Sequence, residues 1–202
     1  MLGRQMSAGV SRRGCRFVVG AAGRVRYAWL RVIEVVKRAR VWRVWGGKNG
    51  ACMKKYESPI KYEVSRIHAA ALYCSDGRMG EHFDDFLQNG LNLPRYDRVS
   101  LPGGPACLAG HPEVHVEEQG VVDELQFLVE VHKLKRVVLI AHEGCAMYIT
   151  RLALKDRRLE LVMRADLVRA AAFVHRVTGL GAIEAYYARM TDGKVVFEEV
   201  EV

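Results

Sequence analysis

Short apolar runs alternate with longer amphipathic stretches along most of the chain. Residues 67–73 and 136–141 are nearly continuous apolar runs, which is typical of strands buried on both faces. Residues 96–101 predict a further strand. Apolar side chains recur at helical spacing in three other stretches. These stretches predict helices over residues 80–89, 117–133 and 164–178.

Glycines indicate where several of these elements end. Gly90 is predicted as the C-cap of the first helix, and Gly179 follows the last one. The remaining tail alternates apolar and polar residues on either side of Asp192-Gly193, which predicts a C-terminal β-hairpin.

Strands that alternate with helices favour an α/β fold with a mainly parallel central sheet flanked by helices. The predicted hairpin would close this fold at the C-terminus. In sheets of this kind, functional sites lie beyond the carboxyl ends of the strands.

Charge divides the chain of 202 residues into two parts. Residues 1–52 contain twelve Lys or Arg and a single acid, Glu34, whereas residues 53–202 contain nineteen bases and twenty-two acids. The net charge of +8 therefore belongs to the N-terminal quarter, and the rest is slightly acidic. A nucleic-acid partner is not expected for the larger part.

The basic segment 1–52 allows three interpretations. Its Arg-rich, acid-poor composition is that of a targeting presequence. As an amphipathic helix over 24–45 it would suit a second subunit or a membrane surface. The third interpretation is a reading frame started too far upstream, with the working protein beginning at Met53. No chemical role is expected for residues 1–52.

Five cysteines without a small secreted framework favour reduced thiols in the cytoplasm. Lys or Arg interrupts every apolar run before it reaches the length of a transmembrane segment, so none is expected.

Metal-ligating side chains follow two of the predicted strands. Cys74 ends the first run, and His142 and Cys145 follow the strand 136–141 in a His-x-x-Cys spacing. Zinc prefers thiolate and imidazole ligands, and three protein ligands leave its fourth position open. A single buried cysteine is more often a small apolar residue, but three such ligands at two strand ends favour a Zn2+ site.

The sequences Cys74-Ser-Asp-Gly-Arg78 and His142-Glu-Gly-Cys145 together resemble the motifs of the β-class carbonic anhydrases, over roughly residues 60–150. The resemblance implies that Cys74, His142 and Cys145 bind zinc and that Asp76 and Arg78 form the paired Asp-Arg of the active site. It implies reversible hydration of carbon dioxide to bicarbonate, with zinc-bound hydroxide as nucleophile. It also implies a homodimer or higher homo-oligomer.

Some positions differ from the family pattern and keep alternatives open. Ala141 and Ala146 stand where the family usually has glycine, and the loop Leu101–Gly110 lacks the usual Arg-Asn-Ala lead-in. One alternative is a hydrolase of a similar molecule, carbonyl sulfide or carbon disulfide. Another is a non-catalytic zinc-binding protein. The candidate proton-relay residues, by residue type alone, are His82, His111 and His115.

Overall fold

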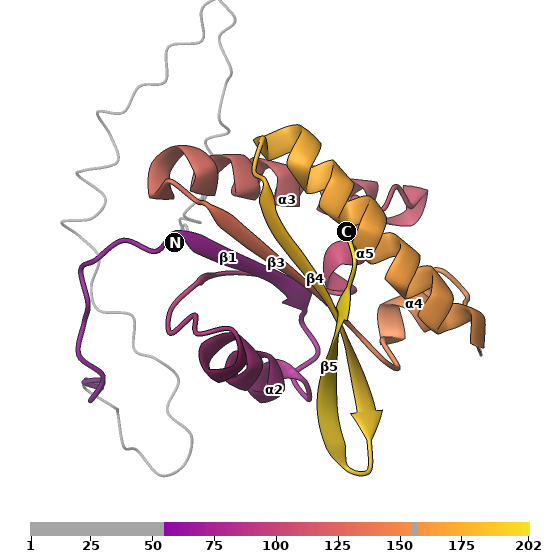
Figure 1. The fold of residues 1–202 in the computed structure, drawn as a ribbon, viewed down its shortest axis with the longest axis horizontal. Helices are drawn as coiled ribbons and strands as arrows, with labels where there is room; N and C mark the ends of the chain where they lie inside the picture. The colour runs from indigo at the N-terminus through magenta and orange to yellow at the C-terminus, as the bar shows by residue number, and fades with distance from the viewer. Residues whose placement is uncertain (1–54, 155–156) are drawn as a thin grey trace, which may run out of the picture. The chain divides into compact units, whose positions relative to one another are not determined.

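The computed structural model describes residues 55–154 and 157–202 (Figure 1). Residues 62–202 form one compact unit, and the described residues 55–61 belong to a separate N-terminal unit. The basic extension predicted for residues 1–52 lies outside the described residues. Its three interpretations, and the domain boundary that follows it, therefore stay predictions.

A five-stranded sheet with the order β2-β1-β3-β4-β5 forms the centre of the unit 62–202. The strands are β1 (Ala69–Cys74), β2 (Asp97–Leu101), β3 (Arg136–His142), β4 (Ala182–Thr191) and β5 (Lys194–Val200). β1 pairs in parallel with β2 and β3, and β3 pairs in parallel with β4. β5 runs antiparallel to β4. The predicted α/β fold with a mainly parallel sheet and a C-terminal hairpin is confirmed.

Helices cover both faces of this sheet (Figure 1). One face carries α2 (Gly80–Asp85) and the π-helical turn η2 (Phe86–Gly90) that continues it. The other face carries α3 (His115–Phe127), its extension η5 (Leu128–His132) and α5 (Arg157–Thr178). Three short helices complete the unit: η3 (Gly104–Leu108), η4 (Pro112–Val114) and α4 (Ala146–Thr150).

The two central strands are buried on both sides, because successive side chains of a strand point to opposite faces. Leu72 and Leu139 pack into the core beneath α3 and α5, whereas Tyr73 and Ile140 pack into the core beneath α2. All six residues of β1 are buried. This double burial explains why β1 and β3 are apolar runs rather than alternating ones.

The first helix ends differently from the prediction. Gly90 is the last residue of η2 and is not left-handed; the first left-handed residue after the helix is Asn92, with φ 53°. The amide of Leu91 donates to the carbonyl of Phe86 over 2.9 Å, which makes the last turn wider than an α-helical one. A Cβ at Gly90 would lie 2.9 Å from Cδ2 of Phe86, so this ring packs closely against the glycine.

The last helix begins at Arg157, earlier than the predicted start at residue 164. Leu159 packs against the core and Met163 is fully buried, so the apolar stripe extends toward the N-terminus. The predicted turns are confirmed: Gly179, directly after the helix, has φ 71°, and both residues of the hairpin turn have positive φ. Within residues 55–154 and 157–202, no helix combines the length and apolar character that crossing a membrane requires.

Candidate metal centre

Two neighbouring strands bring the first candidate ligands together. β1 ends at Cys74 and β3 ends at His142, and the strands run parallel with Tyr73 opposite Ile140. Their carboxyl ends therefore meet at the same edge of the sheet. Cys145 is the N-cap of α4, three residues after His142, so one short loop supplies an imidazole and a thiol.

The three side chains form a compact buried cluster. The candidate ligand atoms of Cys74, His142 and Cys145 all lie within 4.8 Å of one another, and all three residues are buried. The two Sγ atoms are 3.8 Å apart. Two thiolates bound to one tetrahedral zinc, each at about 2.3 Å, would also lie about 3.8 Å apart. The spacing of the two sulfurs therefore fits this metal.

The imidazole of His142 leaves one nitrogen without a partner. Its Nδ1 donates to the carbonyl oxygen of Glu143 over 2.9 Å, since a carbonyl can only accept. Nε2 is buried and has no hydrogen-bond partner among the described residues. Unpaired nitrogens in a protein interior are rare because their desolvation is costly, and metal-binding histidines commonly have this arrangement. Nε2 of His142 is thus available to hold a metal ion.

The two thiols share a hydrogen bond that makes them unequal. The bond from Cys145, with smaller contributions from His142 and the amide of Gly103, lowers the pKa of Cys74. The same bond, together with burial, raises the pKa of Cys145. The protein alone therefore favours one thiolate in this cluster, and thiolate is the form that binds metals.

Two adjacent glycines of the loop after β2 support Cys74. The amide of Gly103 donates to Sγ of Cys74 over 3.4 Å. Gly104 passes so close to β1 that a Cβ there would lie 2.7 Å from the carbonyl carbon of Tyr73. Both glycines have positive φ, 82° and 51°. This supporting role was not predicted from the sequence, although the Pro-Gly-Gly-Pro sequence was an available signal of a tight backbone approach.

Asp76 and Arg78 also lie together, two and four residues after Cys74. The guanidinium donates to both carboxylate oxygens of Asp76, with Nη2 2.6 Å from Oδ2, and the amide of Arg78 adds a bond of 3.0 Å. These bonds, with a smaller effect of the His142 imidazole, hold the pKa of Asp76 well below its usual range. The side chain of Asp76 is 15% exposed and that of Arg78 77% exposed.

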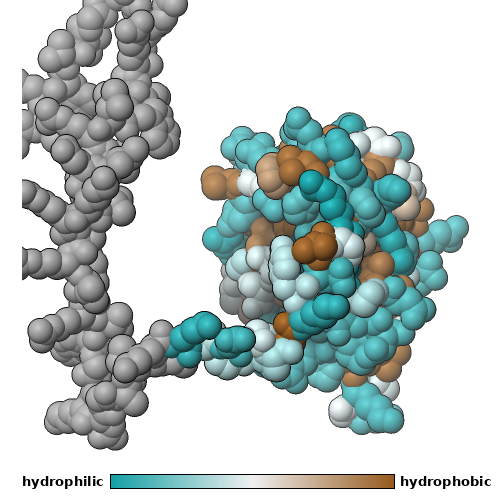
Figure 2. Space-filling view, turned by 90° about the vertical axis from the view of Figure 1, so that its left-hand side faces the viewer, coloured by the Kyte–Doolittle hydropathy of each residue, from teal (hydrophilic) through white to brown (hydrophobic). Residues whose placement is uncertain are grey.

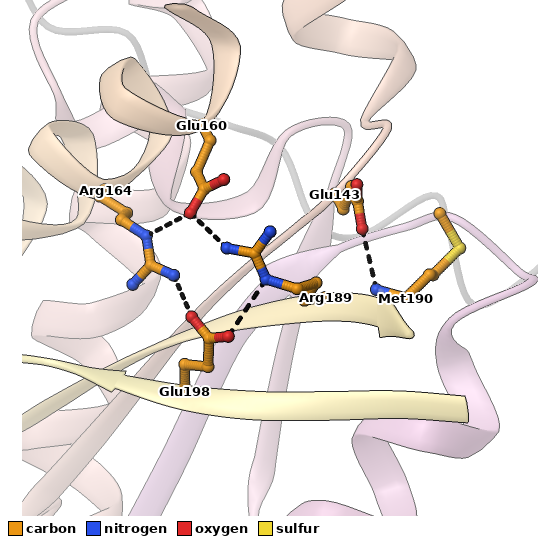
Figure 3. Close-up of polar contacts among 6 residues, drawn as sticks. All are labelled: Glu143, Glu160, Arg164, Arg189, Met190 and Glu198. Atoms are coloured by element: carbon orange, nitrogen blue, oxygen red, sulfur yellow. Dashed lines mark hydrogen bonds and ion pairs between the residues drawn. The ribbon is translucent and has the colours of Figure 1, made fainter. Parts of the chain in front are cut away.

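Glu143 connects the loop between His142 and Cys145 to the neighbouring strand β4 (Figure 3). Its amide donates to the carbonyl of Ala188 over 2.8 Å, and its carboxylate accepts the amide of Met190 over 2.9 Å. No role for Glu143 was predicted from the sequence, although the residue lies inside the His-x-x-Cys motif. The loop between His142 and Cys145 is therefore anchored by both the backbone and a side chain.

A ring of alternating charges fastens α5 to the hairpin beside this loop (Figure 3). Glu160 accepts hydrogen bonds from Arg164 at 2.9 Å and from Arg189 at 2.5 Å. Glu198 on β5 accepts from the same two arginines, the bond from Arg189 measuring 3.1 Å. All four side chains are partly exposed, so the ring orients the hairpin more than it stabilises the fold.

The candidate proton-relay histidines differ in their surroundings. His111 is half-buried, and its Nε2 lies 2.7 Å from a carboxylate oxygen of Asp166, which is fully buried. His82 on α2 and His115 on α3 are exposed. His111 thus already has a strong partner, and a relay through any of the three stays a prediction.

The match to a protein family agrees with this centre. A family model described as "Putative carbonic anhydrase" matches residues 64–189, more than half of the chain. The chain belongs to this carbonic anhydrase family. The resemblance drawn from the two motifs is thereby confirmed, and the matched residues include Cys74, His142 and Cys145.

Relatives of this carbonic anhydrase family member include two rickettsial proteins, both described as uncharacterized. The protein of Rickettsia bellii is 28% identical over 115 residues, which make up 50% of this chain and 69% of the relative. The protein of Rickettsia conorii is 30% identical over 98 residues, 44% of this chain and 52% of the relative. This chain therefore matches about half the length of the second relative.

Solved structures that resemble this carbonic anhydrase family member are distant. A β-carbonic anhydrase of Trichomonas vaginalis gives a TM-score of 0.44 at 14% identity and covers 70% of this chain and 87% of its own. One of Aspergillus fumigatus gives 0.39 at 10% identity, with coverages of 70% and 94%. A tetrameric β-carbonic anhydrase of Sordaria macrospora gives 0.39 at 16% identity, with coverages of 68% and 82%.

Proposed function

We propose that this chain binds one Zn2+ ion through Cys74, His142 and Cys145 and catalyses the interconversion of carbon dioxide and bicarbonate. The observation that carries the proposal is the fit of the buried cluster to zinc: two sulfurs 3.8 Å apart beside an unpartnered imidazole nitrogen. Membership of a carbonic anhydrase family supports the choice of reaction.

The number of ligands favours a catalytic rather than a structural zinc. Within the described residues, this cluster offers three ligand atoms. A structural zinc generally has four protein ligands, whereas a catalytic one keeps a position for water or substrate. The chemistry that zinc supplies when bound is the acidification of water, which yields a nucleophile near neutral pH.

Asp76 and Arg78 would assist beside the metal. An ionised Asp76 can accept a hydrogen bond and so orient a nucleophile toward the carbon of the substrate. Arg78 keeps this carboxylate ionised and fixes its direction with three bonds from one side. Arg78 is thus a positioning residue. Asp76 could instead move onto the metal and close the site.

Two thiolate ligands would set the working pH. Their charges already neutralise Zn2+, so water in this site should be less acidic than in a site built from histidines alone. We therefore expect activity to increase toward mildly alkaline pH.

A homodimer or larger homo-oligomer is proposed on the family resemblance, and sedimentation equilibrium of the zinc-loaded chain tests it.

A cytoplasmic location is proposed because the cysteines in the described residues are free thiols. Subcellular fractionation tests this second proposal.

The decisive experiment combines stopped-flow hydration of carbon dioxide with zinc analysis of the same sample. We expect one zinc per chain and hydration at about pH 8.5 that exceeds the buffer rate by at least tenfold. A fully zinc-loaded protein without hydration would reject the carbonic anhydrase proposal. Parallel assays with carbonyl sulfide and carbon disulfide then separate a hydrolase from a non-catalytic zinc protein.

Three variants assign the roles within the site. Cys74→Ala should lose its zinc, whereas Cys107→Ala, which removes another buried thiol outside the cluster, should keep it. Asp76→Asn should keep zinc and lose about 10- to 100-fold in hydration rate. Asp123→Asn, an exposed carboxylate on α3, should change neither. Full zinc content in Cys74→Ala would reject the ligand assignment.

A further inference from the structure

A basic cavity lies at the sheet edge opposite the metal centre. It has a volume of about 380 Å³ and is located where β1 and β3 begin, whereas the candidate zinc ligands follow the ends of these strands. Figure 2 views the molecule from the side on which β1 begins, where most of the coloured surface is hydrophilic. Five basic side chains line the cavity: Arg66, His68, Arg95, Lys135 and Arg136.

Among the described residues, no acid pairs with most of these basic side chains. Arg66 donates to the carbonyl of Val131 over 2.9 Å. Arg95 donates to the carbonyl of Glu63 over 3.1 Å and to Ser65. Carbonyl and hydroxyl oxygens are neutral acceptors, so both guanidinium groups keep their full positive charge in this arrangement.

Arg136 and Lys135, the next two basic residues, differ in whether a described acid pairs with them. Arg136 forms two bonds of 2.6 Å with Glu184 and is thereby neutralised. The amine of Lys135 has no described carboxylate within ion-pair distance, and the side chain is exposed. None of the described residues that line the cavity is acidic. Like charges gathered without an acid repel one another, and a bound anion would relieve that repulsion.

The backbone around the cavity is well ordered by hydrogen bonds. The carbonyl of His68 accepts the amides of Lys135 at 2.8 Å and Arg136 at 3.2 Å. The ring of His68 donates from Nδ1 to the carbonyls of His132 and Lys133, at 3.2 and 3.0 Å. These bonds join the beginnings of β1 and β3, so the basic side chains extend from a fixed frame.

The size and lining of the cavity suit a small molecule. Pockets for small ligands usually measure about 300 to 1,000 Å³ and combine apolar walls with a few polar groups. The apolar wall here consists of Ile67, Ala69, Leu93 and Pro94. An adjoining cavity of about 280 Å³ shares Arg66, Ile67 and Arg95 with the first, but Glu63 and Asp97 also line it and make it a poorer site for an anion.

We infer that the cavity between Arg66, Arg95 and Lys135 binds a small organic anion that bears phosphate or carboxylate groups. A long polyanion such as nucleic acid is less suitable, because residues 53–202 as a whole carry a net negative charge. The site does not depend on zinc, so the inference is independent of the proposed carbonic anhydrase activity.

Amide NMR spectra of the full chain, recorded at constant ionic strength, test the inference. One titration uses inorganic phosphate and a second uses succinate, which separates a phosphate ligand from a carboxylate one. We expect at least one anion to shift the amides of Ala69, Lys135 and Arg136 along a saturating curve. Non-saturating shifts with both anions would overturn the inference.

Lys135→Gln is the decisive variant, because the amine contacts no described carboxylate and its loss should not disturb the fold. It should weaken anion binding about tenfold, the usual effect of losing one charge-assisted hydrogen bond. Lys194→Gln, at the start of β5, removes an equal charge beside the end of β4, whereas the cavity lies where β4 begins, so this variant should bind as the parent does. Equal affinities of the two variants would overturn the inference.

Discussion

The amide of Gly103 donates a hydrogen bond to Sγ of Cys74 over 3.4 Å, and this bond links the loop after β2 to the end of β1. The next residue, Gly104, would place a Cβ 2.8 Å from the amide nitrogen of Cys74. Gly103 and Gly104 thus allow the loop after β2 to approach the end of β1 closely enough to donate a backbone hydrogen bond to Cys74. Cys74 is positioned by the loop as well as by its own strand.

Gly104→Ala should therefore damage the metal centre. The new methyl group would collide with the backbone of Tyr73 and Cys74, which cannot move aside as a side chain can. We expect a loss of about 2 to 4 kcal/mol in the free energy of unfolding, measured in urea, and a lower zinc content.

Gly110→Ala is the matched control for this variant. Gly110 also has a positive φ, 83°, but a Cβ there would meet nothing within 4 Å. It should lose about 1 kcal/mol from backbone strain alone and keep its zinc. Equal losses in both variants would mean that backbone strain, and not the approach to Cys74, requires the glycine.

The features that could be predicted from the sequence depend on interactions between residues that are close together along the chain. The strand ending at Cys74 and the hairpin turn at Asp192 were predictable, because hydrophobic period and turn chemistry act between residues near in sequence. The extension of α5 to Arg157 was missed, although Leu159 and Met163 continue its apolar stripe. The pattern identified that helix correctly and placed its start too late.

That Cys74, His142 and Cys145 lie close together was also predictable, because two apolar runs that predict strands end beside them. The contacts that support them were not. Gly103 is 29 positions from Cys74, and Met190 is 47 positions from Glu143. Every residue except proline has a backbone amide, so the residue type does not show which distant acceptor the amide will find. Only the folded structure identifies these partners.

Metal removal should destabilise the parent protein through His142. With zinc bound, Nε2 gains the partner that it lacks among the described residues. At a free zinc concentration of about 100 times Kd, the free energy of unfolding should rise by about 2.7 kcal/mol, and a chelator should abolish this gain. His142→Ala should show no response to the chelator, whereas His115→Ala, on the exposed side of α3, should respond as the parent does.

Arg78→Gln should raise the pKa of Asp76 toward its ordinary value of about 4, because the guanidinium bonds that depress it are lost. A carboxylate with a depressed pKa stabilises the folded state above its unfolded pKa and loses this effect as pH falls through the folded pKa. The stability difference between parent and variant should thus be constant at neutral pH and shrink below about pH 4.

Carbon NMR of the side-chain carboxyl groups measures this titration directly. The Asp76 signal should stay that of a carboxylate in the parent at about pH 3 and titrate near about pH 4 in Arg78→Gln. Arg151→Gln, which breaks the ion pair with Glu117 elsewhere, should leave Asp76 unchanged. Identical Asp76 curves in all three proteins would disprove the coupling.

Glu143→Ala tests whether the tether between the ligand loop and β4 holds the metal ligands in place (Figure 3). The substitution removes the carboxylate that accepts the amide of Met190 over 2.9 Å. It leaves the backbone bonds of residue 143 to His142 and Ala188 intact, so the loop loses one anchor of three. Because residues that hold metal ligands in place affect metal affinity, zinc should bind about tenfold more weakly, as measured by competition with a chromophoric chelator.

Glu143→Gln is the control, because it keeps a carbonyl oxygen that accepts the amide of Met190, and it should retain nearly the parent affinity for zinc. If both variants lost zinc affinity equally, the negative charge of Glu143 rather than its hydrogen bond would be what the centre needs.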